Sequence, residues 1–157
     1  MNKNISKKGL TLVELMIAIA AASILILTMS LILMMVFQSW RINNAYVEMR
    51  RNIALAVYLI SRDVRESSIT NVPPGVTVGS LQLSPHPPAR NNTVTYTKAG
   101  SALTSSGFGT VIPRGVQTFT AERNDNADGV YLTIGMTNSI FGSVIAVTNK
   151  VFINTRN

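Results

Sequence analysis

The sequence predicts an α+β protein, in which one long N-terminal helix packs on a C-terminal antiparallel β-sheet. The prediction depends on where the helix breakers lie. All six prolines and nine of the ten glycines occur from residue 73 onward, so residues 10–72 contain neither. Residues 67–157 are rich in Ser, Thr and Asn and hold short β-branched segments between turn residues. The first of these regions is therefore predicted to be helical and the second to form a sheet.

Length and composition limit the functions that the chain can have. The 157 residues suit one small domain, and 14 Lys and Arg against 7 Asp and Glu give a formal net charge of +7. The absence of Cys excludes disulfides, thiolate metal sites and a Cys nucleophile. The single histidine, His86, lies among prolines and reads as an ordinary loop residue. With no Gly-x-Ser-x-Gly elbow and no Gly-rich phosphate loop, the sequence predicts no enzyme, no cofactor and no metal site.

The first element, within residues 10–40, is predicted to be a transmembrane helix. From Leu15 to Trp40 there are 26 consecutive residues without a charge. Leu15–Phe37 alone would form about 34 Å of helix, which matches a hydrocarbon core of about 30 Å. A buried core helix is the alternative, but a domain of this size could not cover such a segment on every side. We therefore expect the lipid bilayer to be a partner.

Two charged features precede this apolar run. Residues 1–9 form a basic leader with no apolar stretch of its own, which a secretory signal peptide would have. Glu14 then lies inside the beginning of the apolar helix, where a carboxylate is costly in lipid. Such a charge indicates a function with a partner; the alternative is a carboxylate that only reaches back to the interface.

The segment Lys8-Gly9-Leu10-Thr11-Leu12-Val13-Glu14-Leu15, followed by an apolar helix, resembles the cleavage and methylation signal of type IV prepilins and the related pseudopilins. The resemblance implies that prepilin peptidase cuts between Gly9 and Leu10, that Leu10 is N-methylated, and that Glu14 guides assembly. The first mature residue is commonly Phe in that family, and here it is Leu10.

The resemblance also implies partners and a location. The partners are other pilin or pseudopilin subunits, the prepilin peptidase and an inner-membrane assembly platform. The chain would cross the inner (cytoplasmic) membrane once, with residues 1–9 cytoplasmic and residues 67–157 extracytoplasmic, and would then enter a pilus or pseudopilus.

Elementary electrostatics agrees with the role that the resemblance gives to Glu14. Cleavage would create an α-amine at Leu10, and such an amine is mostly cationic near neutral pH. An unpaired charge of either sign is costly in a low-dielectric environment. Pairing of Glu14 with the Leu10 amine of an adjacent subunit would therefore favour one axial stagger between neighbouring helices.

Residues 41–66 are predicted to continue the helix as an amphipathic stem, so that one helix runs from about Thr11 to about Glu66. Apolar residues spaced by 4, 3, 4, 3 and 4 place one stripe on a single helix face. We interpret this stripe as core packing, with subunit contact as the alternative. The segment Leu59–Glu66 resembles the Leu-x-x-x-Asp-Leu-Arg stretch of minor pilins and minor pseudopilins. The stripe consists of Ile42, Tyr46, Met49, Ile53, Ala56 and Ile60.

The distal region, residues 67–157, is predicted to be an extracytoplasmic antiparallel sheet. Pro85–Asn92 reads as a rigid exposed loop because of its proline density. Thr148–Lys150 reads as a turn if the last strand is divided in two. The predicted strands are Val76–Val78, Thr93–Thr97, Val116–Thr120, Val130–Met136 and a last strand or pair in Ser143–Val147 and Val151–Ile153.

Calcium and nucleic acid are two further classes of ligand to consider. Asn124–Gly129 has the opening spacing of a calcium loop, but the position that needs a bidentate Glu is Gly135. We favour a hairpin turn at Ala127–Gly129 that joins two strands, and calcium held in another geometry stays the alternative. The arginines of the distal region are scattered with no basic run, so nucleic acid is not an expected partner.

The sequence thus predicts a minor structural subunit of a type IV pilus or pseudopilus. One alternative is a minor pseudopilin of type II protein secretion or of DNA-uptake machinery, which the neighbouring genes would distinguish. Another is a signal-anchored extracytoplasmic binding protein that never assembles. A plain membrane anchor does not require the pair Gly9 and Glu14, which therefore separates the two classes.

Overall fold

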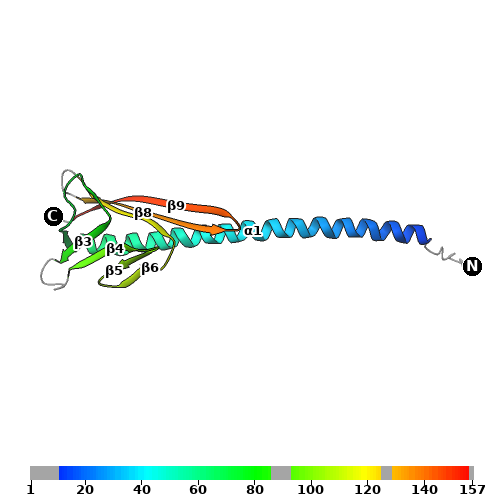
Figure 1. Cartoon of the computed structure of the whole chain (residues 1–157), viewed down its shortest axis with the longest axis horizontal. Helices are drawn as coiled ribbons and strands as arrows, with labels where there is room; N and C mark the ends of the chain where they lie inside the picture. Colours follow the sequence, from blue (N-terminus) through cyan, green and yellow to red (C-terminus); the bar gives the residue numbers. More distant parts are fainter. Residues whose placement is uncertain (1–10, 86–92, 125–128, 156–157) are drawn as a thin grey trace, which may run out of the picture. The chain divides into compact units, whose positions relative to one another are not determined.

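The structure is a computed structural model that describes residues 11–85, 93–124 and 129–155 (Figure 1). The chain divides into two compact units, residues 1–41 and residues 42–157. Helix α1 (Leu12–Arg65) belongs to both units. Its first part makes up nearly all of the described first unit, and its second part enters the core of the second.

Helix α1 is long because nothing in its sequence interrupts it. It contains no Gly or Pro, and Arg62 and Arg65 in its last turn suit the negative end of the helix dipole. The amide of Glu66 donates to the carbonyl oxygens of Arg62 and Asp63, which completes the last turn. The helix predicted from about Thr11 to about Glu66 is confirmed to within one residue at each end.

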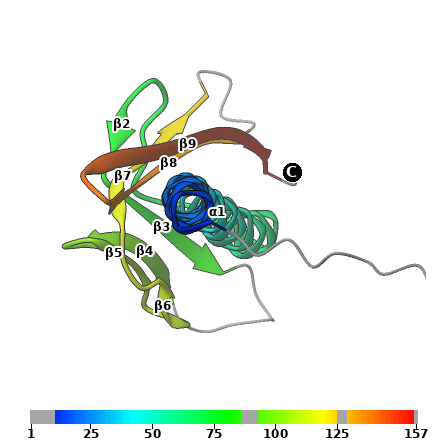
Figure 2. The same ribbon diagram turned by 90° about the vertical axis from the view of Figure 1, so that its right-hand side faces the viewer.

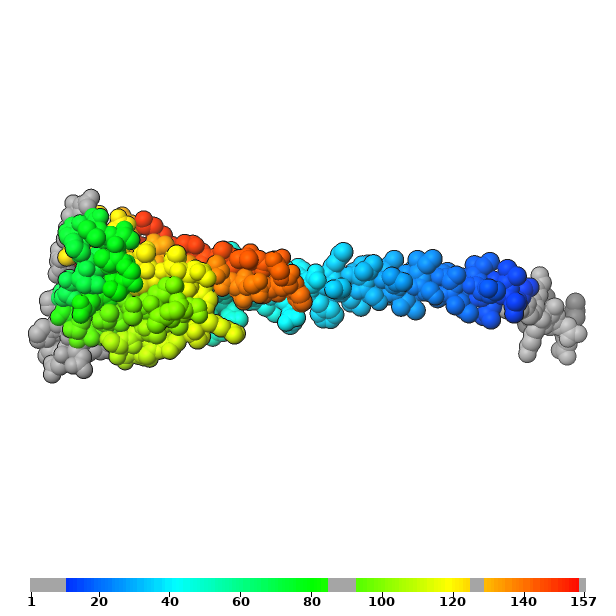
Figure 3. Space-filling model, in the orientation of Figure 1, coloured from blue at the N-terminus to red at the C-terminus, as the bar shows by residue number. Residues whose placement is uncertain are grey.

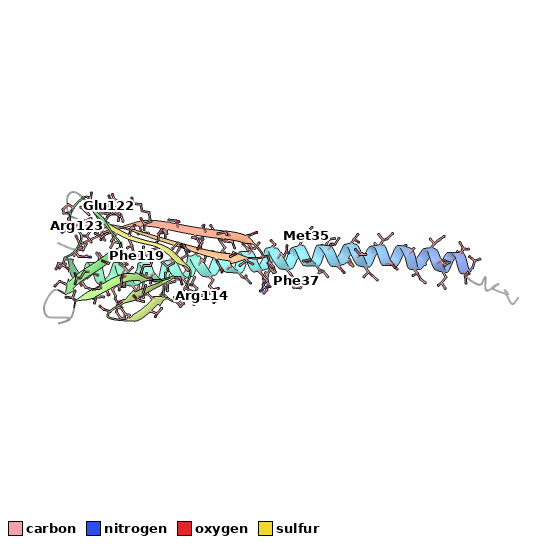
Figure 4. The ribbon with its side chains drawn as sticks, in the orientation of Figure 1. Met35, Phe37, Arg114, Phe119, Glu122 and Arg123 are labelled. Atoms are coloured by element: carbon pink, nitrogen blue, oxygen red, sulfur yellow. The ribbon has the colours of Figure 1, made fainter. Side chains whose placement is uncertain are left out.

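The first unit is an apolar helix whose side chains are exposed within this chain. No residue from Leu12 to Phe37 is buried, and this part of α1 is long and apolar enough to cross a membrane. Its hydroxyl groups donate to carbonyl oxygens of the preceding turn, as Ser23 does to Ile19 at 2.8 Å. Figure 4 shows Met35 and Phe37 projecting away from the helix axis. The unit therefore offers a continuous apolar surface to lipid or to other helices.

The described residues of the second unit contain nine strands in two antiparallel sheets, where the sequence predicted a single sheet. One sheet has the order β1-β3-β4-β5-β6, with β1 (Ser67–Ile69), β3 (Ser80–Pro85), β4 (Val94–Ala99), β5 (Ala102–Ser105) and β6 (Gly109–Ile112). The other has the order β2-β7-β8-β9, with β2 (Thr77–Val78), β7 (Val116–Arg123), β8 (Gly129–Ile140) and β9 (Ser143–Asn154).

The core forms where one face of α1 packs on both sheets. Figure 2 shows the two sheets covering adjoining sides of the helix. Four residues of the predicted stripe are buried, whereas Ile42 and Tyr46 are only partly buried. The helix thus contributes to an α+β core, as predicted. The buried apolar side chains of α1 are Ala45, Met49, Ile53, Ala56, Ile60 and Val64, and among those of the sheets are Leu81, Leu83, Tyr96, Leu103, Ile112, Leu132 and Ile134.

The last strand differs from one sequence-based reading. The predicted turn at Thr148–Lys150 is wrong, because β9 runs unbroken and pairs with β8 along its whole length. Asn149 lies opposite Ile134 and Lys150 opposite Thr133, so the long, β-branched partner strand holds these turn-prone residues in extended conformation. The loop predicted at Pro85–Asn92 falls on residues 86–92, which lie outside the described residues.

Strands β8 and β9 are joined by a turn of two residues, Phe141 and Gly142, between the paired residues Ile140 and Ser143. Both turn residues have positive φ, 52° for Phe141 and 78° for Gly142, which is the requirement of a type I′ turn. Among the described residues, Phe141 is the one non-glycine residue with positive φ.

Candidate functional site

The N-terminus of α1 holds the predicted assembly residue in a capping box. Thr11 precedes the first helical residue, and its amide and hydroxyl group each donate to Oε2 of Glu14 at 2.9 Å. The amide of Glu14 donates back to the Thr11 hydroxyl oxygen at 3.3 Å. Two backbone donors that the helix itself cannot satisfy are thereby paired.

The local sequence explains this geometry. Thr at the N-cap and Glu three residues later form the Thr-x-x-Glu pattern of a capping box, and a carboxylate in the first turn also suits the positive end of the helix dipole. Thr11 was not among the predicted site residues. The pattern directly before an apolar run is the signal that identifies it.

The cap leaves the Glu14 carboxylate available for a further partner. Both bonds from Thr11 go to Oε2, and Glu14 is exposed within this chain among apolar residues of the helix. A carboxylate has about four lone-pair sites, so it can accept bonds from a cation without breaking the cap. The site can therefore pair with an ammonium group of another chain, and it holds the carboxylate in place for that pairing.

The other predicted site residues lie wholly or partly outside the described residues. Gly9 and Leu10 lie outside the described residues, as does His86. Of the Asn124–Gly129 segment, residues 125–128 also lie outside them. At its edges the amide of Asn124 donates to the carbonyl oxygen of Gly129 at 3.0 Å, between the paired strands β7 and β8. Within the described ranges no three His, Asp or Glu side chains gather where they could hold a metal ion.

Close packing requires glycine at position 129, whether or not the neighbouring segment binds calcium. A Cβ atom at this position would meet the carbonyl oxygen of Ile153 and the ring of Phe152 at 2.5 Å. Those atoms belong to β9, which pairs with Gly129 through Asn154. Glycine is thus required for the close approach of β8 and β9 at this end of the sheet.

A second polar cluster joins the end of α1 to the first sheet. The carboxylate of Asp63, 3% exposed, accepts a 2.7 Å bond from the phenol of Tyr96 and bonds of 3.2 and 3.3 Å from Arg62. Burial, and then the hydrogen bond to Asp63, raises the pKa of Tyr96. The hydrogen bond to Asp63 raises the pKa of Arg62. The guanidinium of Arg62 also lies 5.3 Å from the centre of the Phe108 ring. We interpret this cluster as structural.

Comparison with known proteins bears on the N-terminal site. Residues 5–30 match the family model described as the prokaryotic N-terminal methylation motif. No curated protein and no solved structure matches the chain. The matched range contains Gly9, Leu10, Thr11 and Glu14 together with the first part of the apolar helix. The chain therefore carries the N-terminal methylation motif that is the signal of type IV pilins.

Proposed function

We propose that the chain is a minor structural subunit of a type IV pilus or pseudopilus, without catalysis of its own. One observation supports this most: the matched motif coincides with a lone carboxylate, Glu14, at the start of an apolar helix that its own chain leaves exposed. An apolar surface of this extent has to be covered by lipid or by other helices. A filament subunit uses both in turn, lipid before assembly and neighbouring helices after it.

The proposal divides the chain by role. Residues 1–9 are a cytoplasmic leader that prepilin peptidase removes, and Leu10 becomes the methylated N-terminus. Residues 10–40 cross the inner membrane and carry the assembly contacts, residues 41–66 are the stem, and residues 67–157 are extracytoplasmic. An inner-membrane assembly platform then moves the processed subunit into the filament. The minor assignment rests on the resemblance of Leu59–Glu66 to the stem end of minor subunits.

Glu14 acts in this proposal through the Leu10 amine of an adjacent subunit. Before assembly, Thr11 satisfies one oxygen of the carboxylate, which limits the cost of holding the charge near lipid. During assembly, the cationic amine of the neighbour offers a charge-assisted bond that Thr11 cannot. Because only one stagger brings the two groups together, the pair sets the axial register of the subunit.

The experiment compares variants that separate capping from pairing. Glu14→Ala removes both functions, Glu14→Gln keeps an acceptor for the Thr11 amide but cannot neutralise an ammonium, and Thr11→Val removes only the hydroxyl part of the cap. Each full chain is expressed in its native host, and crosslinking to partner pilins is measured together with processing. Both Glu14 variants should be inserted and cleaved but should fail to crosslink, whereas Thr11→Val should crosslink nearly as wild type does.

Two results would contradict the proposed pairing. Wild-type crosslinking by Glu14→Ala and Glu14→Gln would show that the carboxylate only reaches the interface. Equal loss of crosslinking in Thr11→Val and Glu14→Ala would show that the capped helix end, rather than the charge, is what assembly needs.

A further inference from the structure

The two described sheets have four edges, and three of these edges are short. Edge strands β1, β2 and β6 contain three, two and four residues, whereas edge strand β9 contains twelve. Figure 1 shows β9, in orange and red, running along the outside of its sheet. Short edge strands limit pairing with other chains. Strand β9 is therefore the described edge that is long enough to accept another strand.

Strand β9 also lacks most of the features that protect a long edge. It contains no proline, its register with β8 is unbroken, and Ser143–Asn149 carries no charge. Its one charged residue is Lys150, whose Nζ lies 3.9 Å from Oε2 of Glu122. Figure 3 shows orange and red atoms of β9 at the surface of the second unit. Because proteins usually block a long edge with proline, charge or a bulge, the uncharged part of β9 indicates a partner strand.

The register shows which backbone groups of β9 face away from β8. Ile140 and Ser143 flank the two-residue turn and form a hydrogen-bonded pair, so every second residue from Ser143 onward bonds to β8. Ala146 and Thr148 alternate with those residues, and their amide and carbonyl groups therefore point outward. Thr137, the partner of Ala146, accordingly donates its amide proton on the β7 side of β8. Among the described strands, none pairs with the outward groups of β9.

A groove lies between this open edge and α1. Its volume is about 580 Å³, and it is lined by Tyr46, Arg50 and Ile53 of α1 and by residues 146–149 of β9. A strand that pairs with the edge would lie along the groove and would place alternate side chains toward α1. Extended peptides bind to sheet edges in this way, with main-chain hydrogen bonds for affinity and side-chain contacts for specificity.

The charge of the groove indicates the chemistry of its occupant. Arg50 is the one charged residue among the described residues that line it. Its guanidinium donates to the Tyr46 hydroxyl group at 2.8 Å and lies 4.6 Å from the centre of that ring, while its other N–H groups can serve a further acceptor. A carboxylate is the matching group. A second copy of β9 would bring Lys150 and no acidic residue, so it is the poorer match.

We propose that an extended acidic segment of a partner protein binds along β9, as a fifth strand of the sheet β2-β7-β8-β9, with a carboxylate on Arg50. The outward groups of Ala146 and Thr148 supply the main-chain bonds, and Tyr46 and Val147 offer apolar contacts beside the carboxylate. The inference goes beyond the proposed function and does not depend on it, because every residue that it uses belongs to the second unit.

The probe is a labelled, end-capped peptide, Thr-Val-Thr-Glu-Thr-Val-Thr, whose Val and Glu side chains share one face of a strand. Its binding to the full chain in micelles is measured by fluorescence anisotropy. The same peptide with Lys in place of Glu should bind at least about tenfold more weakly. Of two further peptides, one N-methylated at the Thr residues and one at the Val and Glu residues, only one should bind, because only one set of amides faces β9.

Two results with these peptides would contradict the proposal. Equal binding of the two N-methylated peptides would show that no main-chain pairing takes place. Equal binding of the Glu and Lys peptides would show that the groove does not select an acidic partner.

Thr148→Pro tests the edge itself. It removes an outward N–H group without removing a bond to β8, so the fold should be kept while peptide binding is lost. Asn154→Pro makes the same kind of change at the end of β9, outside the groove, and should bind the peptide as wild type does. The same affinity in Thr148→Pro and wild type would overturn the proposal.

A second variant leaves β9 unchanged and so excludes misfolding of the edge as the cause of a loss. Arg50→Gln should weaken binding of the Glu peptide by about tenfold and should hardly affect a peptide with Gln in place of Glu. Equal effects on the two peptides would contradict the pairing of Arg50 with a carboxylate. Self-association of the chain without peptide, abolished by Thr148→Pro, would assign the edge to a second copy and overturn the acidic partner.

Discussion

The phenol of Tyr96 on β4 donates a 2.7 Å hydrogen bond to the carboxylate of Asp63, in the last turn of α1. Tyr96 is fully buried and Asp63 is 3% exposed. A buried carboxylate is tolerated only where hydrogen-bond donors replace the water that would otherwise solvate it. Here Tyr96 donates to one oxygen of Asp63 and Arg62 donates to the other. This bond therefore ties the end of α1 to the first sheet.

Tyr96→Phe should lower the free energy of unfolding by about 1–3 kcal/mol, because it removes a 2.7 Å hydrogen bond to a buried carboxylate. The measurement is denaturant unfolding of the full chain in micelles. Tyr131→Phe is the matched control, because the Tyr131 ring contacts Phe152 while no described residue hydrogen-bonds to its phenol. Equal losses in the two variants would show that the Asp63 bond contributes nothing beyond ring packing.

The same bond predicts a response to alkaline pH. Burial and Asp63 raise the pKa of Tyr96 above the usual value of about 10, so the folded state keeps the proton after the unfolded chain has released it. This contribution to stability is complete below about pH 10 and declines above it, by up to about 1.4 kcal/mol per pH unit. The stability difference between wild type and Tyr96→Phe should therefore narrow as pH rises above 10. A constant difference would contradict the raised pKa.

Residues with a local or periodic signal were predictable. Helix α1 follows from a stretch without Gly or Pro, and strand β8 was expected at Val130–Met136, where the alternating residues Val130, Leu132, Ile134 and Met136 are all buried. At the candidate site the motif around Gly9 and Glu14 was recognisable, and Thr11 could have been recognised from its capping-box spacing.

Structural features that depend on residues far apart in the sequence were not predictable. The burial of Asp63 follows from Tyr96, 33 residues away, and no local pattern marks that pairing. Strands β5 and β6 are four residues each and carry Ser, Thr or Gly, so their propensity is weak until neighbouring strands pair with them. The unbroken course of β9 is likewise imposed by the long partner strand β8.

Gly129→Ala should destabilise the second unit by about 1–3 kcal/mol, since the added methyl group would press on the backbone of Ile153 and on the Phe152 ring. Gly79→Ala is the control: a methyl group added there would have no atom within 4 Å, so stability should stay within about 0.5 kcal/mol or rise slightly. Thermal unfolding of both full-length variants checks this. Equal midpoints would contradict the close packing of β8 on β9.

The Asn124–Gly129 segment should act as a turn without obligatory metal. The bond between Asn124 and Gly129 and the pairing of β7 with β8 already close the connection without an ion. Thermal unfolding of the full chain with calcium, and then with a chelator, should give nearly the same midpoint. A large rise with calcium would overturn the prediction, because an ion that binds the folded state alone stabilises it by mass action.

The central claim, that the chain is a processed pilin-type subunit, is tested most directly at its N-terminus. Protein extracted from the membrane of the native host is examined intact and after proteolysis by mass spectrometry. We predict a mature chain that begins at Leu10, N-methylated, and lacks the three lysines of residues 1–9. A mature chain that still carries Lys7-Lys8-Gly9 would contradict the claim, since neither the methylated terminus nor the Leu10 amine that pairs with Glu14 would then exist.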